Sequence, residues 1–160
     1  MKIRVGAKAE RGRIHEILAA TGRFTTEEIG WAMELVDLAF AQPARREYEI
    51  HVAEDETGAV TGYVCFGPTP MSDGVWDLYW LAVDPKSQGH GIGNMLLHFV
   101  ESEIRGRGGR MLLIETSSKR SYAATRRFYE RAGYREISRI KDFYRIEDDK
   151  VVFSKDLAQP

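Results

Sequence analysis

The sequence has little of several features that mark specialised classes of protein. Cys65 is its only cysteine, so no disulfide forms within the chain. No stretch approaches the roughly 18 consecutive apolar residues of a membrane-spanning helix. The first residues, MKIRVGAKAERGRIHEI, lack the apolar core of a signal peptide. These absences predict a cytoplasmic protein without a membrane partner.

An excess of basic charge is also missing, because 23 Lys and Arg residues are balanced by 24 Asp and Glu residues. A nucleic-acid-binding domain usually carries a strongly basic surface, so nucleic acid is not an expected partner. No metal site is predicted either, since His15, His51, His90 and His98 fall on different predicted elements. The 160 residues, 43% of them hydrophobic, fit one domain spanning 1–160.

Apolar spacing and turn residues predict a mixed α/β (α+β) fold with a mostly antiparallel sheet. The predicted strands are 3–7, 48–54, 59–66, 75–83, 111–116, 134–143 and 150–155, and the predicted helices are 11–20, 25–40, 91–105 and 121–133. The second helix is the best marked, with Thr25 as N-cap and Glu28 three residues later. Only strands 75–83 and 111–116 are connected through a helix, which is the usual connection between two parallel strands.

A glycine-rich turn, QGHGIGN, connects strand 75–83 to the next helix. Its glycines at 89, 91 and 93 do not match the dinucleotide-binding pattern, which needs a glycine where Asn94 stands, and no Gly-Lys-Ser/Thr closes a P-loop. Glycines allow close approach to the backbone, and a helix N-terminus offers free N–H groups to a pyrophosphate. The plainer alternative is a tight turn without a ligand.

Several segments together resemble the GNAT superfamily of acetyl-CoA-dependent N-acetyltransferases. They are the strand end LAVDP, the turn QGHGIG, the strand MLLIET and the segment ATRRFYERAGY, and the resemblance covers nearly the whole chain. It implies the GNAT fold, with helices on both faces of the sheet. It also implies that the parallel strands 75–83 and 111–116 splay apart around the cofactor.

The same resemblance implies a set of cofactor-binding residues. The pantetheine arm of acetyl-CoA pairs with the backbone of Leu81, Ala82 and Val83, and one of their N–H groups faces the thioester oxygen. The pyrophosphate is held by the turn residues Gln88, Gly89, His90, Gly91, Ile92, Gly93 and Asn94. Many members have Asn where Tyr122 stands here, so Ser121 or Ser118 takes over its contact. Arg126, Arg127, Arg131 and the run 105–110 are candidates for the 3′-phosphate.

The resemblance also implies three catalytic candidates. Tyr129 occupies the position of the family's general acid, and its helix is expected to turn Phe128 inward as an anchor. Asp77 and Glu115 are alternative general bases, each matched to a different branch of the family, and a water chain is the third possibility. Each residue also has a plain structural role available, as a core aromatic or a solvated carboxylate.

The acceptor is expected to be a primary amine, on a small molecule or a peptide, and its identity stays open. A non-catalytic acyl-CoA-binding sensor is the alternative function, and a nucleotide-binding regulatory domain is a third. The sequence also leaves open whether two copies form a homodimer.

Overall fold

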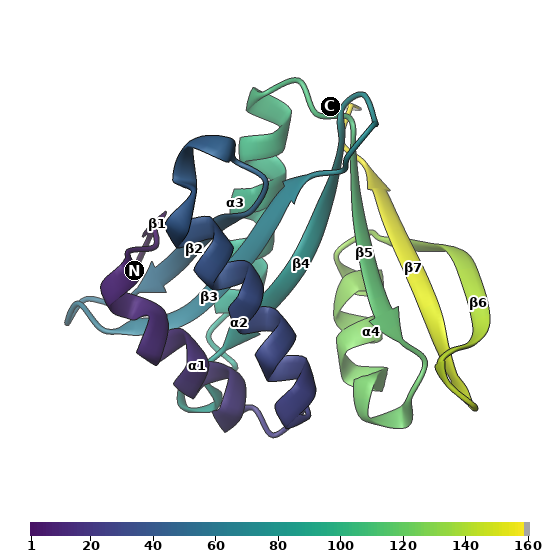
Figure 1. The fold of residues 1–160 in the computed structure, drawn as a ribbon, viewed down its shortest axis with the longest axis horizontal. Helices are drawn as coiled ribbons and strands as arrows, with labels where there is room; N and C mark the ends of the chain where they lie inside the picture. The colour runs from purple at the N-terminus through teal and green to yellow at the C-terminus, as the bar shows by residue number, and fades with distance from the viewer. Residues whose placement is uncertain (159–160) are drawn as a thin grey trace.

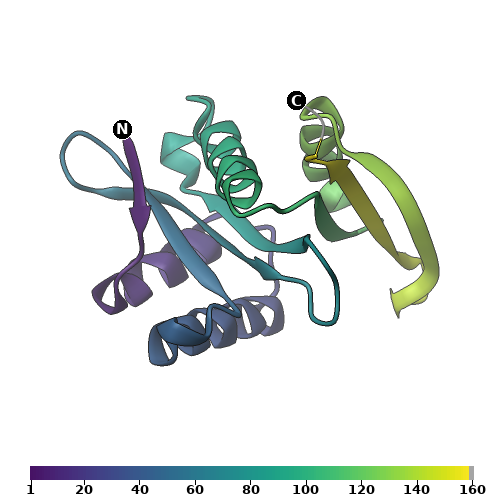
Figure 2. The same ribbon diagram turned by 90° about the horizontal axis from the view of Figure 1, so that it is seen from above.

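The computed structural model describes residues 1–158, which form one seven-stranded sheet covered by helices on both faces (Figures 1 and 2). The strands are β1 (Lys2–Val5), β2 (Glu49–Glu54), β3 (Val60–Pro68), β4 (Val75–Val83), β5 (Met111–Ser117), β6 (Arg135–Arg145) and β7 (Asp148–Asp156). The helices are α1 (Arg11–Ala20), α2 (Thr26–Ala41), α3 (Ile92–Gly106) and α4 (Ala123–Arg131). Four short 3₁₀ turns are η1 (Lys8–Glu10), η2 (Pro43–Arg45), η3 (Pro85–Ser87) and η4 (Arg120–Tyr122).

The strand order is β1-β2-β3-β4-β5-β7-β6, and only β4 and β5 run parallel. This confirms the predicted mixed, mostly antiparallel sheet with one parallel crossover through α3. Strand β3 is buried from Val60 to Gly67, because α1 and α2 cover one of its faces and α3 covers the other. Strand β6 is exposed along its whole length, because it lies at the edge of the sheet.

Helix α2 begins as the sequence predicts. The Thr25 hydroxyl accepts a hydrogen bond from the Glu28 N–H, and the Glu28 carboxylate accepts one from the Thr25 N–H. This capping box satisfies two backbone donors that a helix start leaves free. The prediction for the last helix was less accurate, since Ser121 lies in η4 and α4 begins only at Ala123.

Two cores lie on opposite faces of the sheet, beneath the helices that Figure 2 shows on either side. One packs α1 and α2 against β2, β3 and β4, and includes Ile17, Val36 and Tyr63. The other packs α3 and α4 against the centre of the sheet, and includes Leu97 and Phe153. Among residues 1–158, no helix is long and apolar enough to cross a membrane.

A buried ion pair joins α3 to β7 within the second core. The Glu101 side chain is 3% exposed, and both of its carboxylate oxygens accept hydrogen bonds from Lys155 Nζ, at 2.9 and 3.1 Å. The Tyr134 hydroxyl donates to Glu101 Oε1 at 2.9 Å, and Lys155 also donates to the Ala132 carbonyl oxygen. These contacts tie α3 to the half of the sheet that contains β7.

Removing the lysine leaves the buried Glu101 carboxylate with only the longer contact to Arg105, whose Nη2 lies 3.7 Å from Glu101 Oε2. We therefore expect Lys155→Met to lower the free energy of unfolding by about 3 kcal/mol. Urea unfolding at neutral pH measures this change. Lys2→Met is the matched control, because Lys2 is 65% exposed and pairs with Glu54 at the surface. We expect it to cost at most about 1 kcal/mol, and equal losses in the two variants would contradict the assigned role of Glu101.

Candidate active site

The parallel strands β4 and β5 diverge partway along their length, which opens a V in the sheet (Figure 1). They pair from Val75–Met111 to Leu78–Ile114 and no further within the described residues. On its other side β4 stays paired with β3 up to Val83. The edge of residues 79–83 that faces the V therefore carries backbone groups available to a ligand. The Val83 carbonyl oxygen is an exception, because the Gln88 side chain donates to it. The divergence of β4 and β5 is the splay that the family resemblance implies.

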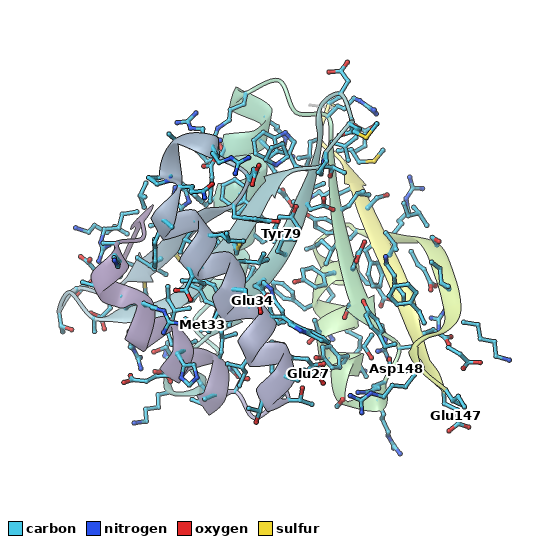
Figure 3. The ribbon with its side chains drawn as sticks, in the orientation of Figure 1. Glu27, Met33, Glu34, Tyr79, Glu147 and Asp148 are labelled. Atoms are coloured by element: carbon cyan, nitrogen blue, oxygen red, sulfur yellow. The ribbon has the colours of Figure 1, made fainter. Side chains whose placement is uncertain are left out.

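A β-bulge in β4 lies where the V begins. Cys65 of β3 pairs with Trp80 and Phe66 pairs with Leu78, so Tyr79 is the extra residue. A bulge bends its strand and increases the local twist. It also changes the side-chain alternation, because Tyr79 and Trp80 are consecutive and yet both pack with the core of α1 and α2. Tyr79 is labelled in Figure 3. Leu81 and Val83 then pack with the α3 side, while Ala82 is buried on the other.

The glycine turn places the N-terminus of α3 beside the V. Gly89 and Gly91 have φ angles of +82° and +76°, in the left-handed region that glycine adopts at no steric cost. Gly91 is the N-cap of α3 and makes no side-chain capping bond, so the first N–H groups of the helix are free of such a partner. A Cβ at Gly89 or Gly91 would meet no heavy atom within 4 Å. The turn thus presents open space and unsatisfied donors, as a pyrophosphate requires.

Other turn residues have roles in holding the loop. The Gln88 N–H donates to the Pro85 carbonyl oxygen at 3.4 Å, and the Gln88 side chain donates to the Val83 carbonyl oxygen at 3.2 Å. His90 Nδ1 lies 3.2 Å from the Ser87 carbonyl oxygen, and the Ile92 side chain is buried in the core. The backbone N–H groups that follow Gln88 in the turn have no such hydrogen-bond partner among the described residues.

A hollow of about 400 Å³ lies between the N-terminus of α3 and helix α4. Its lining is Asn94, Ala124, Arg127, Phe128 and Arg131. Neither Arg127 nor Arg131 forms an ion pair with any described residue, so both guanidinium groups are available to an anion. Gly93 lies at the same place, where a Cβ would be 3.5 Å from the Phe128 ring.

Two of the predicted arginine candidates are placed elsewhere. Arg126 donates to the carbonyl oxygens of Ser117 and Lys119, at 2.7 and 2.8 Å, and so holds α4 to the end of β5. The run 105–110 lies at the opposite end of α3, where Arg107 pairs with Glu103 and Arg110 donates to the Asp73 carbonyl oxygen. Ser121 is exposed in η4, and no contact of its side chain assigns it a role.

The two candidate bases lie on one face of the sheet where β4 and β5 separate. Asp77 is partly buried, and its carboxylate accepts a hydrogen bond from the Thr69 hydroxyl at 2.7 Å. Burial raises the pKa of Asp77 above its ordinary value, and the nearby negative charge of Glu115 adds to this. Glu115 is exposed and pairs with Lys150 Nζ at 3.0 Å. The sequence alone gave no sign of Lys150 or Thr69.

Tyr129 lies in the core beneath the V and is only 6% exposed. Its ring packs edge-on against Phe128 and Tyr134. Burial raises the pKa of Tyr129, so the phenol keeps its proton at neutral pH. The prediction that Phe128 turns inward holds only in part, because Phe128 packs against the second core but also lines the hollow, and Tyr129 is the more deeply buried of the two. Adjacent helical residues point about 100° apart, and in α4 the Tyr129 position is the one directed at the sheet.

The fold and site together define a class of protein. A family model for the acetyltransferase (GNAT) domain matches residues 46–136. A protein from Desulfovibrio desulfuricans described as a GNAT-family acetyltransferase has 39% identity and a TM-score of 0.91, with 98% of each chain covered. The chain therefore belongs to the GNAT acetyltransferase family, and it is an acetyltransferase. A search of curated protein sequences finds no match.

More distant solved structures share the fold. An acetyltransferase from Salmonella typhimurium, determined with its cofactor acetyl-CoA, has 24% identity and a TM-score of 0.72, covering 98% of this chain and 94% of its own. The ribosomal-protein-S18-alanine N-acetyltransferase from Escherichia coli has 19% identity and a TM-score of 0.75, covering 98% and 93%.

If the glycine turn holds the pyrophosphate, a carboxylate placed in it should repel the ligand. We expect Gly91→Asp to weaken CoA binding by at least about tenfold in titration calorimetry. Gly91→Asn separates charge from backbone strain, because Asn tolerates the left-handed conformation and is neutral. Gly12→Asp is the control, since Gly12 in α1 is also in open space. Unchanged affinity in a folded Gly91→Asp protein would reject the assignment.

Proposed function

We propose that the protein transfers the acetyl group of acetyl-CoA to a primary amine by direct attack of the amine on the thioester. The observation that carries this proposal is the continuity of three features: the free edge of β4, the uncapped N-terminus of α3 and the hollow between α3 and α4. These three features lie one after another in space, in the same order as the thioester arm, the pyrophosphate and the 3′-phosphate along acetyl-CoA. Membership of the family supports the same co-substrate.

Each part of the cofactor has residues suited to it. Backbone groups of residues 81–83 pair with the amides of the pantetheine arm, as an added strand would. One of these N–H groups, at Leu81 or beside it, stabilises the oxyanion that forms when the amine attacks. The N–H groups that follow Gln88 in the turn hold the pyrophosphate, and Arg127 and Arg131 hold the 3′-phosphate.

The amine approaches from the face of the sheet that carries α2, because both carboxylates lie there. We assign the general base to Asp77, whose raised pKa brings it closer to neutrality and whose hydrogen-bond partner, Thr69, is uncharged. Glu115 already pairs with Lys150, so it suits binding of a cationic acceptor better than proton removal. Water relays the proton from the amine to Asp77 where the two do not touch.

Tyr129 is the proposed general acid. When the tetrahedral intermediate collapses, the sulfur of CoA leaves with developing negative charge, and a protonated phenol can donate to it. The phenol of Tyr129 carries the proton that this role requires, since its pKa lies above neutrality and burial raises it further. Phe at this position would remove the hydroxyl and leave the ring packing against Tyr134 and Phe153 in place.

A screen of primary amines that follows release of the free CoA thiol should find at least one acceptor for the wild type. With that acceptor, we expect Tyr129→Phe to keep its fold and its acetyl-CoA affinity and to lose at least about tenfold in kcat. The loss should fall on a step that depends on the basicity of the leaving thiol. Wild-type turnover by the folded variant would return Tyr129 to a purely structural role.

The pH dependence of kcat/KM should distinguish the two carboxylates. The base must be deprotonated, so activity falls as the pH drops through the raised pKa of Asp77. In Asp77→Asn we expect this fall of kcat/KM at low pH to disappear, and we expect the maximal kcat/KM to be about 100-fold lower than in the wild type. Glu115→Gln should raise the KM for the acceptor and should keep the fall of kcat/KM at low pH. A fall of kcat/KM at low pH that is due to protonation of the acceptor amine would persist in both variants. An unchanged pH dependence of kcat/KM in Asp77→Asn would exclude Asp77 as the base.

A further inference from the structure

A chain of aromatic side chains spans the open mouth of the V. Phe24, in the connection between α1 and α2, packs edge-on against Trp80 of β4, with ring centroids 5.3 Å apart. On its other side Phe24 packs against Tyr122 of η4, which follows β5, with centroids 6.4 Å apart. The Phe24 side chain, from a third segment, therefore contacts both β4 and the segment that follows β5.

A hydrogen bond closes the same gap. The Tyr122 hydroxyl donates to Glu28 Oε1 at 3.3 Å, across 94 residues of sequence. The other oxygen of Glu28 is fixed by the N–H of Thr25 at 2.7 Å, in the capping box of α2. Burial and the Glu28 charge raise the pKa of Tyr122, so its phenol stays a donor. Within the described residues, Glu28 has no Lys, Arg or His partner within 4 Å that would compete for this bond.

We propose that Phe24, Tyr122 and Glu28 form a crossbar that closes the mouth of the V and keeps bulk water from the thioester. This inference rests on the proposed function, which places the thioester between β4 and β5. The sheet itself cannot close this gap, because pairing ends at Leu78–Ile114. Side chains from the α1–α2 connection, α2 and η4 are therefore needed to exclude solvent at this end.

The reaction prevented is hydrolysis. Water would add to the thioester carbonyl, the C–S bond would break, and acetate and the CoA thiol would leave, with one proton released. An enzyme that binds acetyl-CoA before its acceptor needs a barrier against this loss, and removing water from the site also strengthens its electrostatic interactions. Phe24 and Tyr122 are positioning residues in this account and do not take part in acetyl transfer.

The test is the rate of acetyl-CoA hydrolysis in the absence of any amine. We expect Phe24→Ala and Tyr122→Ala to raise this rate about tenfold while acetyl-CoA affinity changes little. Tyr122→Phe keeps the ring and loses only the bond to Glu28, so its rise should be smaller. Leu38→Ala is the control, because Leu38 is an exposed residue of α2 about 15 Å along the helix from Glu28. It should hydrolyse acetyl-CoA at the wild-type rate.

Wild-type hydrolysis rates in Phe24→Ala and Tyr122→Ala that still bind acetyl-CoA would overturn the crossbar. If Phe24→Ala does not fold, Phe24→Leu keeps an apolar side chain and loses the aromatic contacts, and the same criterion applies to it. Binding of 3′-phospho-ADP, which lacks the pantetheine arm, detects a general collapse of the cofactor site, because the crossbar variants should bind it as the wild type does. A wild type that binds no acetyl-CoA would instead remove the proposed function and the crossbar with it.

Discussion

The bulge at Tyr79 is the constraint on which the rest of the structure depends. It bends β4 away from β5 just after the last parallel pair, Leu78–Ile114. An unbroken sheet would satisfy those backbone groups internally and would leave no edge for a ligand. The same extra residue also turns Tyr79 and Trp80 toward one face. One local irregularity thus creates the edge to which we assign the cofactor, and it sets the aromatic surface beside the two carboxylates.

A sheet divided in this way needs other contacts to hold its halves together. On the α3 face, the buried Glu101–Lys155 pair joins the two halves, with Tyr134 completing the carboxylate's hydrogen bonds. On the α2 face, Phe24 and the Tyr122–Glu28 bond span the same gap. The first contact is buried and charged, and the second is longer and partly buried. The α3 side is thus built for rigidity, while the α2 side, where we propose that the acceptor enters, is more easily opened.

Much of the fold follows from local sequence signals. Thr25 and Glu28 specify the start of α2, and the apolar spacing after Gly91 specifies α3. The glycine turn could be placed because Gly89 and Gly91 need left-handed conformations. The bulge could not be predicted, because it depends on the register with β3 and has no signal of its own in β4. Nor could the deeper burial of Tyr129 relative to Phe128, or the use of Arg126 to hold α4, since packing and long-range hydrogen bonds decide them.

Amide hydrogen exchange with and without CoA tests the central claim most directly. If the V holds the pantetheine arm, CoA should slow exchange at those amides of residues 79–83 that point away from β3, and at the turn residues 89–94. Amides of β4 that already bond to β3 should change little, which provides an internal reference within one strand. Protection confined to other parts of the chain, or none at residues 79–83 under saturating CoA, would contradict the account.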